Sequence, residues 1–181
     1  MAQTQSASRA DEALERVKSA LKETISEPKV NFGTVDLICE PGDLVGVMTA
    51  LRDSEGIECK FFGFLSAVDR SELGEGGGGL EVLIVVYSPV HFFSVAVHVP
   101  VAAAAPACPS VSGVYSGALW HERETHEMFG IVFEGHPQLS NLYLPEDFEG
   151  HPGLRSFKLP GRAVKDWPGA KDPEEAAAGG R

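Results

Sequence analysis

The sequence contains few of the residues that build a metal centre or a nucleic-acid surface. Its three cysteines, Cys39, Cys59 and Cys108, include no CxxC pair and have no histidine at zinc-finger spacing, so no iron–sulfur cluster or zinc knuckle is encoded locally. Basic residues are also scarce, because 15 lysines and arginines are outnumbered by 26 aspartates and glutamates, giving a net charge of −11. This charge repels phosphate backbones and argues against a nucleic-acid partner.

Long apolar runs are missing as well. The most hydrophobic region, residues 80–109, is interrupted by Glu81, two histidines and several prolines, whereas a membrane span needs about 20 predominantly apolar residues. The first residues contain no apolar signal core, and scattered thiols in odd number fit a reducing compartment. The sequence therefore predicts a cytoplasmic protein, and 181 residues favour one domain with tails.

Hydrophobic periodicity predicts two helices near the N-terminus. Apolar residues at helical spacing over 10–25 indicate an amphipathic helix that ends before Pro28. Asp43 is placed to cap a second helix, whose i, i+3, i+4 and i+7 positions are apolar: Leu44, Val47, Met48 and Leu51.

Strands are expected over 34–39, 59–65, 80–87 and 92–99, with a glycine-rich turn over 69–79. The GxGxxG pattern in that turn precedes a strand and has no helix after it, so it does not indicate a nucleotide site. The fold class expected is α+β. Two N-terminal helices would pack on a mainly antiparallel sheet, followed by a signature helix and a long extended C-terminal tail.

The segment after Ile131 has a different character from the rest of the chain. Prolines and glycines exclude long helices or strands there, yet it keeps large apolar residues: Phe133, Leu142, Tyr143, Phe148, Phe157 and Trp167. Such a segment is expected to lie along another surface. We therefore predict four parts: a disordered stretch over 1–9, an α+β core over 10–130, an extended partner-docking tail over 131–170, and a disordered end over 171–181.

The densest polar cluster lies within residues 120–131 and predicts a helix closed by Gly130. His121 and His126 resemble part of the HExxH zinc motif, but their i, i+5 spacing sets them about 140° apart around a helix, whereas two zinc ligands need i, i+4. A small metal-dependent hydrolase built on His121, Glu122 and His126 is therefore a disfavoured alternative.

The same helix is expected to carry a docking face. Trp120, Glu124 and Met128 share one side, and Arg123 can reach Glu127 one turn on. Glu124 is interpreted as a carboxylate held at an interface by an arginine, although a merely solvated charged face is the plain alternative.

A short repeat, Phe-Glu-Gly-His-Pro, occurs at 133–137 and again at 148–152. No third ligand follows at a helpful spacing, and a residue before proline is restricted to extended geometry, so structural turns are preferred over a metal site.

These motifs together resemble signatures of the C-subunit family, or thirty-kilodalton subunit family, of the respiratory NADH:quinone oxidoreductases (complex I). The helix matches W-x-E-R-E-x-x-x-h-F-G-I, and the two repeats match F-x-G-H-P-x-L and L-P-x-D-F-x-G-H-P; the resemblance covers about 61–168. The family usually has basic residues where this chain has Ser140 and Asn141, and here Gly153 interrupts a motif in which Ser156 replaces lysine. The residues that carry the resemblance, and that we expect to dock a partner, are Trp120, Glu122, Arg123, Glu124, Phe129, Gly130, Ile131, Gly135, His136, Pro137, Leu144, Pro145, Asp147, Phe148, Gly150, His151, Pro152 and Arg155.

The resemblance implies a non-catalytic, cofactor-free subunit in the peripheral arm of a proton-translocating enzyme, on the cytoplasmic face of the cell membrane. Its partners would be the large D subunit, which helps to form the quinone site, and the iron–sulfur B subunit. NADH, FMN, iron–sulfur clusters and quinone would belong to the assembly, and the isolated chain would be inactive. The alternative within the family is the equivalent subunit of a membrane-bound energy-converting hydrogenase.

Overall fold

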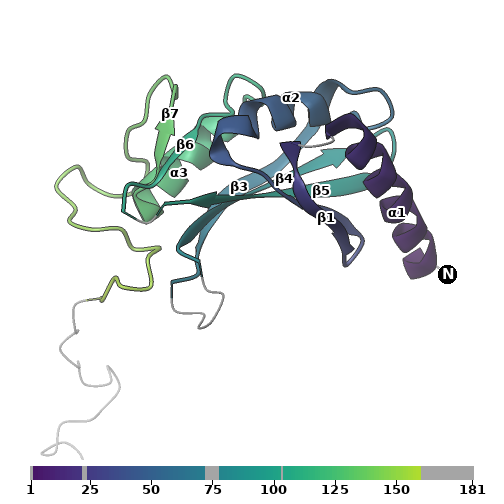
Figure 1. Cartoon of the computed structure of the whole chain (residues 1–181). Coiled ribbons are helices and arrows are strands. Elements are labelled where there is room, and N and C mark those ends of the chain that lie inside the picture. The colour runs from purple at the N-terminus through teal and green to yellow at the C-terminus, as the bar shows by residue number, and fades with distance from the viewer. Residues whose placement is uncertain (1, 22–23, 72–77, 103, 160–181) are drawn as a thin grey trace, which may run out of the picture.

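A five-stranded sheet forms the centre of the protein in the computed structural model, which describes residues 2–21, 24–71, 78–102 and 104–159 (Figure 1). The strand order is β1-β2-β5-β4-β3, and every neighbouring pair is antiparallel except β2 and β5. The mainly antiparallel sheet confirms the predicted α+β class. The strands are β1 (Ser26–Asn31), β2 (Thr34–Ile38), β3 (Phe61–Asp69), β4 (Leu80–Ser88) and β5 (Phe93–Val101).

The described residues form three α-helices that accompany this sheet. They are α1 (Ala2–Leu21), α2 (Leu44–Asp53), preceded by the short 3-10 helix η2 (Pro41–Asp43), and α3 (Ala118–Phe129). A second, two-stranded parallel sheet joins β6 (Ala107–Pro109) to β7 (Val132–Glu134). No helix within the described part of the chain is long and apolar enough to cross a membrane.

One face of the large sheet is covered and forms the core. The alternation of β-branched residues places matching side chains on this face, as in the cross-strand neighbours Val35, Val95 and Val86. The side of α2 predicted to be apolar packs into the core, because Leu44, Val47, Met48 and Leu51 are fully buried. α1 packs against β1, β2, β5 and α2.

The N-terminal region differs from the sequence expectation in two ways. α1 begins at Ala2, so residues 2–9, expected to be disordered, lie in the helix. It ends at Leu21 rather than before Pro28, and Pro28 lies within β1. β1 is an edge strand, where proline is tolerated because one side of the strand needs no ladder hydrogen bond.

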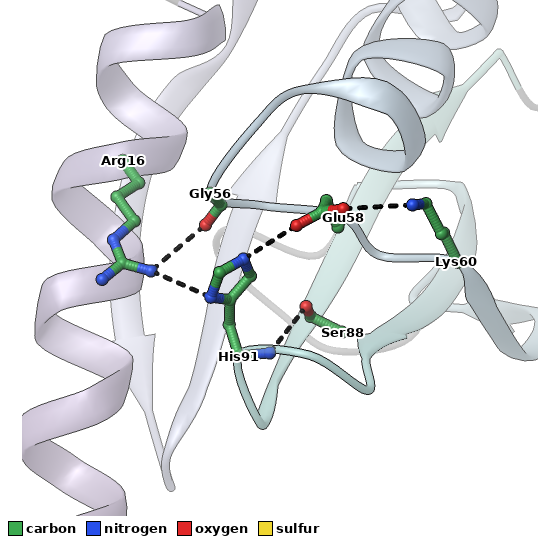
Figure 2. Close-up of polar contacts among 6 residues, drawn as sticks. All are labelled: Arg16, Gly56, Glu58, Lys60, Ser88 and His91. Carbon is green, nitrogen blue, oxygen red and sulfur yellow. Dashed lines mark hydrogen bonds and ion pairs between the residues drawn. The ribbon is translucent and has the colours of Figure 1, made fainter.

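A polar cluster ties α1 to the end of the sheet (Figure 2). Arg16 of α1 donates to the Gly56 carbonyl oxygen at 3.2 Å, and its Nη1 lies 3.4 Å from His91 Nδ1. Because arginine only donates, His91 accepts at Nδ1 and carries its proton on Nε2, which lies 3.1 Å from a Glu58 carboxylate oxygen. Lys60 pairs with the other Glu58 oxygen at 3.1 Å.

Candidate docking site

The signature helix α3 lies along β3, the edge strand of the large sheet. His121 points at the strand, and its Nδ1 lies 3.1 Å from the Leu65 carbonyl oxygen. Its ring packs edge-on against the ring of Phe62, with the two centroids 5.3 Å apart. His126 instead has Nδ1 at 2.8 Å from the Ile131 carbonyl oxygen. The two histidines therefore do not converge, and within the described ranges no three His, Cys, Asp or Glu residues are grouped to hold a metal ion.

Gly130 closes α3, as the sequence predicted. Its backbone is left-handed (φ 76°), and its N–H donates to the His126 carbonyl oxygen at 2.8 Å. A Cβ at this position would lie 2.7 Å from Nε2 of His151, so glycine is also required by the close approach of the tail.

Glu122 is completely buried and holds the loop after β6. Its two oxygens accept hydrogen bonds from the Val111 N–H at 2.7 Å and the Ser110 hydroxyl at 2.6 Å. Burial raises the pKa of this carboxyl above its usual range, although the bonds from Ser110 and Val111 act in the opposite direction. Glu122 is thus committed to packing rather than to an exposed docking contact.

The raised pKa of Glu122 predicts a distinctive pH profile. The native protein keeps the proton where the unfolded chain has already lost it, so this group removes stability as pH rises from its unfolded pKa, about 4.3, through its native pKa. We expect Glu122→Gln, relative to wild type, to gain thermal stability as pH increases through that window. Melting temperatures of both proteins between pH 4 and pH 8 measure the difference. Exposed Glu15→Gln is the control, and a difference for Glu122→Gln that stays constant with pH would contradict the assignment.

Glu127, 3% exposed, anchors the tail to α3. Its carboxylate accepts from three consecutive backbone N–H groups, those of Leu142 at 3.0 Å, Tyr143 at 3.1 Å and Leu144. Burial alone would raise the pKa of this carboxyl, but the three N–H donors, together with the charge of Arg123, hold it below its usual range. No spacing pattern marks Glu127 as the anchor, because its partners are backbone groups fifteen to seventeen residues away.

Arg123 also binds the tail, and so differs from the prediction that it pairs with a glutamate of its own helix. Its guanidinium donates to the carbonyl oxygens of Ser140 at 2.8 Å and Asn141 at 2.9 Å, and it lies over the Trp120 ring at 5.2 Å from the centroid. The backbone accepts these bonds, so they are independent of the basic side chains that the family pattern has there. Glu124 is half-buried, and among the described residues it has no hydrogen bond or ion pair.

The two histidines of the repeat tie the tail to both ends of α3. His136 accepts the Gln138 N–H at Nδ1, so its Nε2 donates to the Leu119 carbonyl oxygen at 3.0 Å. At the other end, His151 Nδ1 lies 2.9 Å from the Glu127 carbonyl oxygen. The repeat is therefore a pair of turns that clamp one helix.

Gly153, the residue that interrupts the family pattern, completes the helix end. Its N–H donates at 2.8 Å to the carbonyl oxygen of Met128, one of the last carbonyls that a helix leaves without an internal partner. A Cβ at Gly153 would lie 2.8 Å from that same oxygen and 2.8 Å from the Phe129 ring. The insertion is accommodated because it is a glycine.

The remaining signature residues divide between the core, the turns and the surface. Ile131 and Phe133 are buried in the core, and β7 pairs with β6, so the core extends to Glu134 and beyond the boundary expected at residue 130. Arg155 donates from its backbone and from Nε to Asp69 at the end of β3. Trp167 lies outside the described residues. The other predicted positions lie in the irregular segment that follows β7: Gly135, Pro137, Leu144, Pro145, Asp147, Phe148, Gly150 and Pro152.

A family model described as the 30 Kd subunit of respiratory-chain NADH dehydrogenase matches residues 37–163, a range that includes the whole of α3 and the described tail. The chain belongs to this family. The NADH-quinone oxidoreductase C subunit of Salinispora tropica is 35% identical over 162 residues, which are 90% of this chain and 65% of that protein. The C subunit of a Roseiflexus species is 37% identical over 135 residues, which are 75% of this chain and 76% of that one.

Two solved structures share the fold of this family member. A trypsin-resistant fragment of Nqo5 superposes with a TM-score of 0.57 at 20% identity, over 72% of this chain and 99% of the fragment. A chain of the membrane-bound sulfane sulfur reductase, an archaeal respiratory membrane complex, gives a TM-score of 0.66 at 18% identity, over 83% of this chain and 86% of that chain. The chain spans 65% of the length of the Salinispora relative, so it matches only a part of that protein.

Proposed function

We propose that this chain is a non-catalytic, cofactor-free subunit of a proton-translocating NADH:quinone oxidoreductase, and that it docks through α3 and its tail. Family membership supports this assignment, as do the names of the similar C-subunit proteins. NADH, FMN, iron–sulfur clusters and quinone are carried by other subunits of the assembly. The partners are the large D subunit and the iron–sulfur B subunit, at the cytoplasmic face of the membrane.

The observation that carries the proposal is a hydrogen-bonded surface with exposed aromatic rings. α3 uses Glu127, Arg123 and the two repeat histidines to fix the tail, yet Trp120 is 62% exposed and Tyr143 is 65% exposed. Large aromatic residues on an ordered surface are typical of the centre of an interface, where little conformational entropy is lost on binding.

A hollow beside Trp120 supplies the second half of such a site. It has a volume of about 330 Å³ and lies between the outer side of α3 and the first repeat turn, where Leu119, Trp120, Arg123, His136, Pro137 and Gln138 line it. The two buried carboxylates of α3, Glu122 and Glu127, accept hydrogen bonds from groups of the same chain. Glu124 is therefore the acidic residue of this helix that can form an ion pair with a partner. The site is therefore built for contact with a protein surface rather than for acid–base chemistry.

The equivalent subunit of a membrane-bound energy-converting complex is the second candidate. The TM-score of 0.66 to a chain of an archaeal respiratory membrane complex favours it. In that case the docking role stays the same, and the electron donor and acceptor of the assembly change.

The docking role predicts that Trp120→Ala weakens assembly. An interface residue of this kind contributes about 2 kcal/mol, so we expect about 30-fold less complex at subsaturating partner, with an unchanged melting temperature of the free chain. Phe92→Ala is the matched control, because Phe92 is equally exposed, at 61%, but lies in the turn before β5. Co-purification of the tagged full chain with the large subunit measures the effect. Equal yields for the two variants would exclude α3 as the docking surface.

A further inference from the structure

The second face of the large sheet is open in the described part of the protein. Figure 1 shows α2 over one face and no helix over the other, which is concave. The strand registers place four rows of side chains on this open face: Thr34, Ser94, Tyr87 and Phe61; Asp36, Ala96, Val85 and Phe64; Ile38, His98, Leu83 and Ser66; and Pro100, Glu81 and Val68.

The composition of the open face is unusual for a solvated surface. An antiparallel sheet with one covered face normally carries polar residues on the other. The two central rows of this face instead combine three polar residues with five apolar ones: Ala96, Val85, Phe64, Ile38 and Leu83. Phe61 is 60% exposed and Phe64 is 40% exposed. Phe64 lines a shallow hollow of about 420 Å³ that reaches across β2, β5, β4 and β3.

The opposite rim of this hollow is formed by Phe32, in the tight turn between β1 and β2. Phe32 is fully exposed, and its backbone is left-handed (φ 49°), a conformation that is costly for an aromatic residue. A strained backbone that presents a large ring to solvent gives no stability to the free chain, and it is a common property of binding surfaces.

The acidic side chains of the open face differ in their partners: the one at the end of the face has ion pairs, and the one near its centre has none among the described residues. Glu81 accepts from His98 at 2.6 Å and from Arg70 at 3.0 Å. Asp36, in a central row, accepts a hydrogen bond from the neutral amide of Asn31 at 2.5 Å, and its carboxylate has no other hydrogen bond to the described residues. Lys29 lies opposite Asp36 in the register of β1 and β2 but forms no ion pair with it. The half-buried Asp36 carboxylate therefore has no ion pair among the described residues, although Lys29, Arg70 and His98 line a hollow together with it.

We propose that this open face is a second docking site, and that it binds an amphipathic helix of a partner subunit whose apolar stripe carries one arginine or lysine opposite Asp36. Five strands span about 19 Å between the first and last, and a helix with side chains is about 10–12 Å wide, so one helix fits between Phe32 and Phe64. The net charge of −11 also favours a basic partner. This proposal rests on the proposed function, because it requires the chain to be a subunit of an assembly.

Accessibility of a single cysteine tests the site in the assembled complex. The three native thiols are buried, and burial raises the pKa of each to about 12, so they form little reactive thiolate at neutral pH. Ser94→Cys places a thiol on the open face in β5, the central strand of the sheet, and Ser54→Cys, equally half-buried after α2, is the control. We expect maleimide labelling of Ser94→Cys to slow at least tenfold on assembly, while Ser54→Cys is unchanged. Equal labelling of Ser94→Cys in the free chain and in the complex would overturn the proposal.

The charge requirement is tested separately with the same complex. Asp36→Lys should reduce the yield of assembled complex about tenfold, and Glu40→Lys, which makes the same charge change at an exposed position off the face, should not. Equal yields of complex for Asp36→Lys and Glu40→Lys would show that no partner cation binds Asp36, and would overturn the proposal.

The identity of the occupant is tested by a photo-crosslinking residue at Val85. The crosslinked peptide should belong to a helix of a co-purifying subunit and contain arginine or lysine. A peptide from a second copy of this chain, or from residues 160–181, would overturn the proposal. Retained sensitivity to Trp120→Ala together with an accessible Ser94→Cys would show that this second site fails while the proposed function stands.

Discussion

Glu127→Ala should release the tail from α3 and leave the core folded. The variant removes a buried carboxylate that accepts three backbone N–H groups, and hydrogen bonds to charged groups contribute about 1.5–3 kcal/mol each. If the net loss is about 2.7 kcal/mol, the equilibrium constant for local opening of the tail increases about 100-fold. We therefore expect amide exchange at Leu142, Tyr143 and Leu144 to rise about 100-fold, measured by hydrogen exchange with mass spectrometry.

The same tether should be lost in wild type at acid pH. The native pKa of Glu127 is lowered, so its contribution is fully present above the unfolded value, about 4.3, and disappears as pH falls through the native pKa. Glu134→Ala, at an exposed position of β7, is the control and should leave exchange of the tail unchanged. Slow exchange at 142–144 in Glu127→Ala would show that the tail is held by its other contacts alone.

Truncation of the chain at two points should separate folding from docking. The sequence suggested that the core survives removal of everything after Ile131. The structure predicts the opposite, because Phe133 is 2% exposed in the core and β7 contributes hydrogen bonds, including that from the Ser110 N–H to the Glu134 carbonyl oxygen at 2.8 Å. Loss of a buried phenylalanine costs about 3–5 kcal/mol, which lowers the melting temperature of a chain of this length by about 10 °C or more.

Truncation after Leu139 keeps β7, Phe133 and the His136 clamp, and should melt within a few degrees of the full chain. It removes the segment that Arg123 and Glu127 hold, so it should still fail to pull down the large subunit. Thermal unfolding and pull-down are measured on both truncated chains. If both melt alike, β7 is not part of the core; if the longer one binds like the full chain, the tail after Leu139 has no docking role.

The elements that could be predicted from the sequence are those whose periodicity is local. The apolar positions of α2, the paired strands around the turn at 88–92, and the end of α3 at Gly130 all follow from spacing within a single element. β1 could not be predicted, since it contains Pro28 and few apolar residues and is defined by its pairing with β2.

The helix α3 and the two repeat turns could be predicted from the sequence, but the contacts between them could not. The motif identified α3 and the two repeat turns, and these do meet. The role of Glu124 at an interface stays a prediction. The role of Glu127 in holding the tail was not predicted, because carboxylate-to-backbone bonds leave no pattern in the partner residues. The role of Gly153 could not be predicted either. A family pattern shows that a residue is inserted, but it does not show that this residue lies close to the Met128 carbonyl oxygen.

The parallel pairing of β2 with β5 sets the order in which this chain can fold during synthesis. The register joins Thr34 to Ser94, about 60 positions later, so the N-terminal unit has no sheet neighbour on its inner edge until β5 is made. The hairpin of β4 and β5 is local and forms quickly, whereas closing the long loop before it is slow. A ribosome-bound chain that has not yet released residue 101 therefore has β2 paired only with β1, and the other edge of β2 stays open until β5 is available.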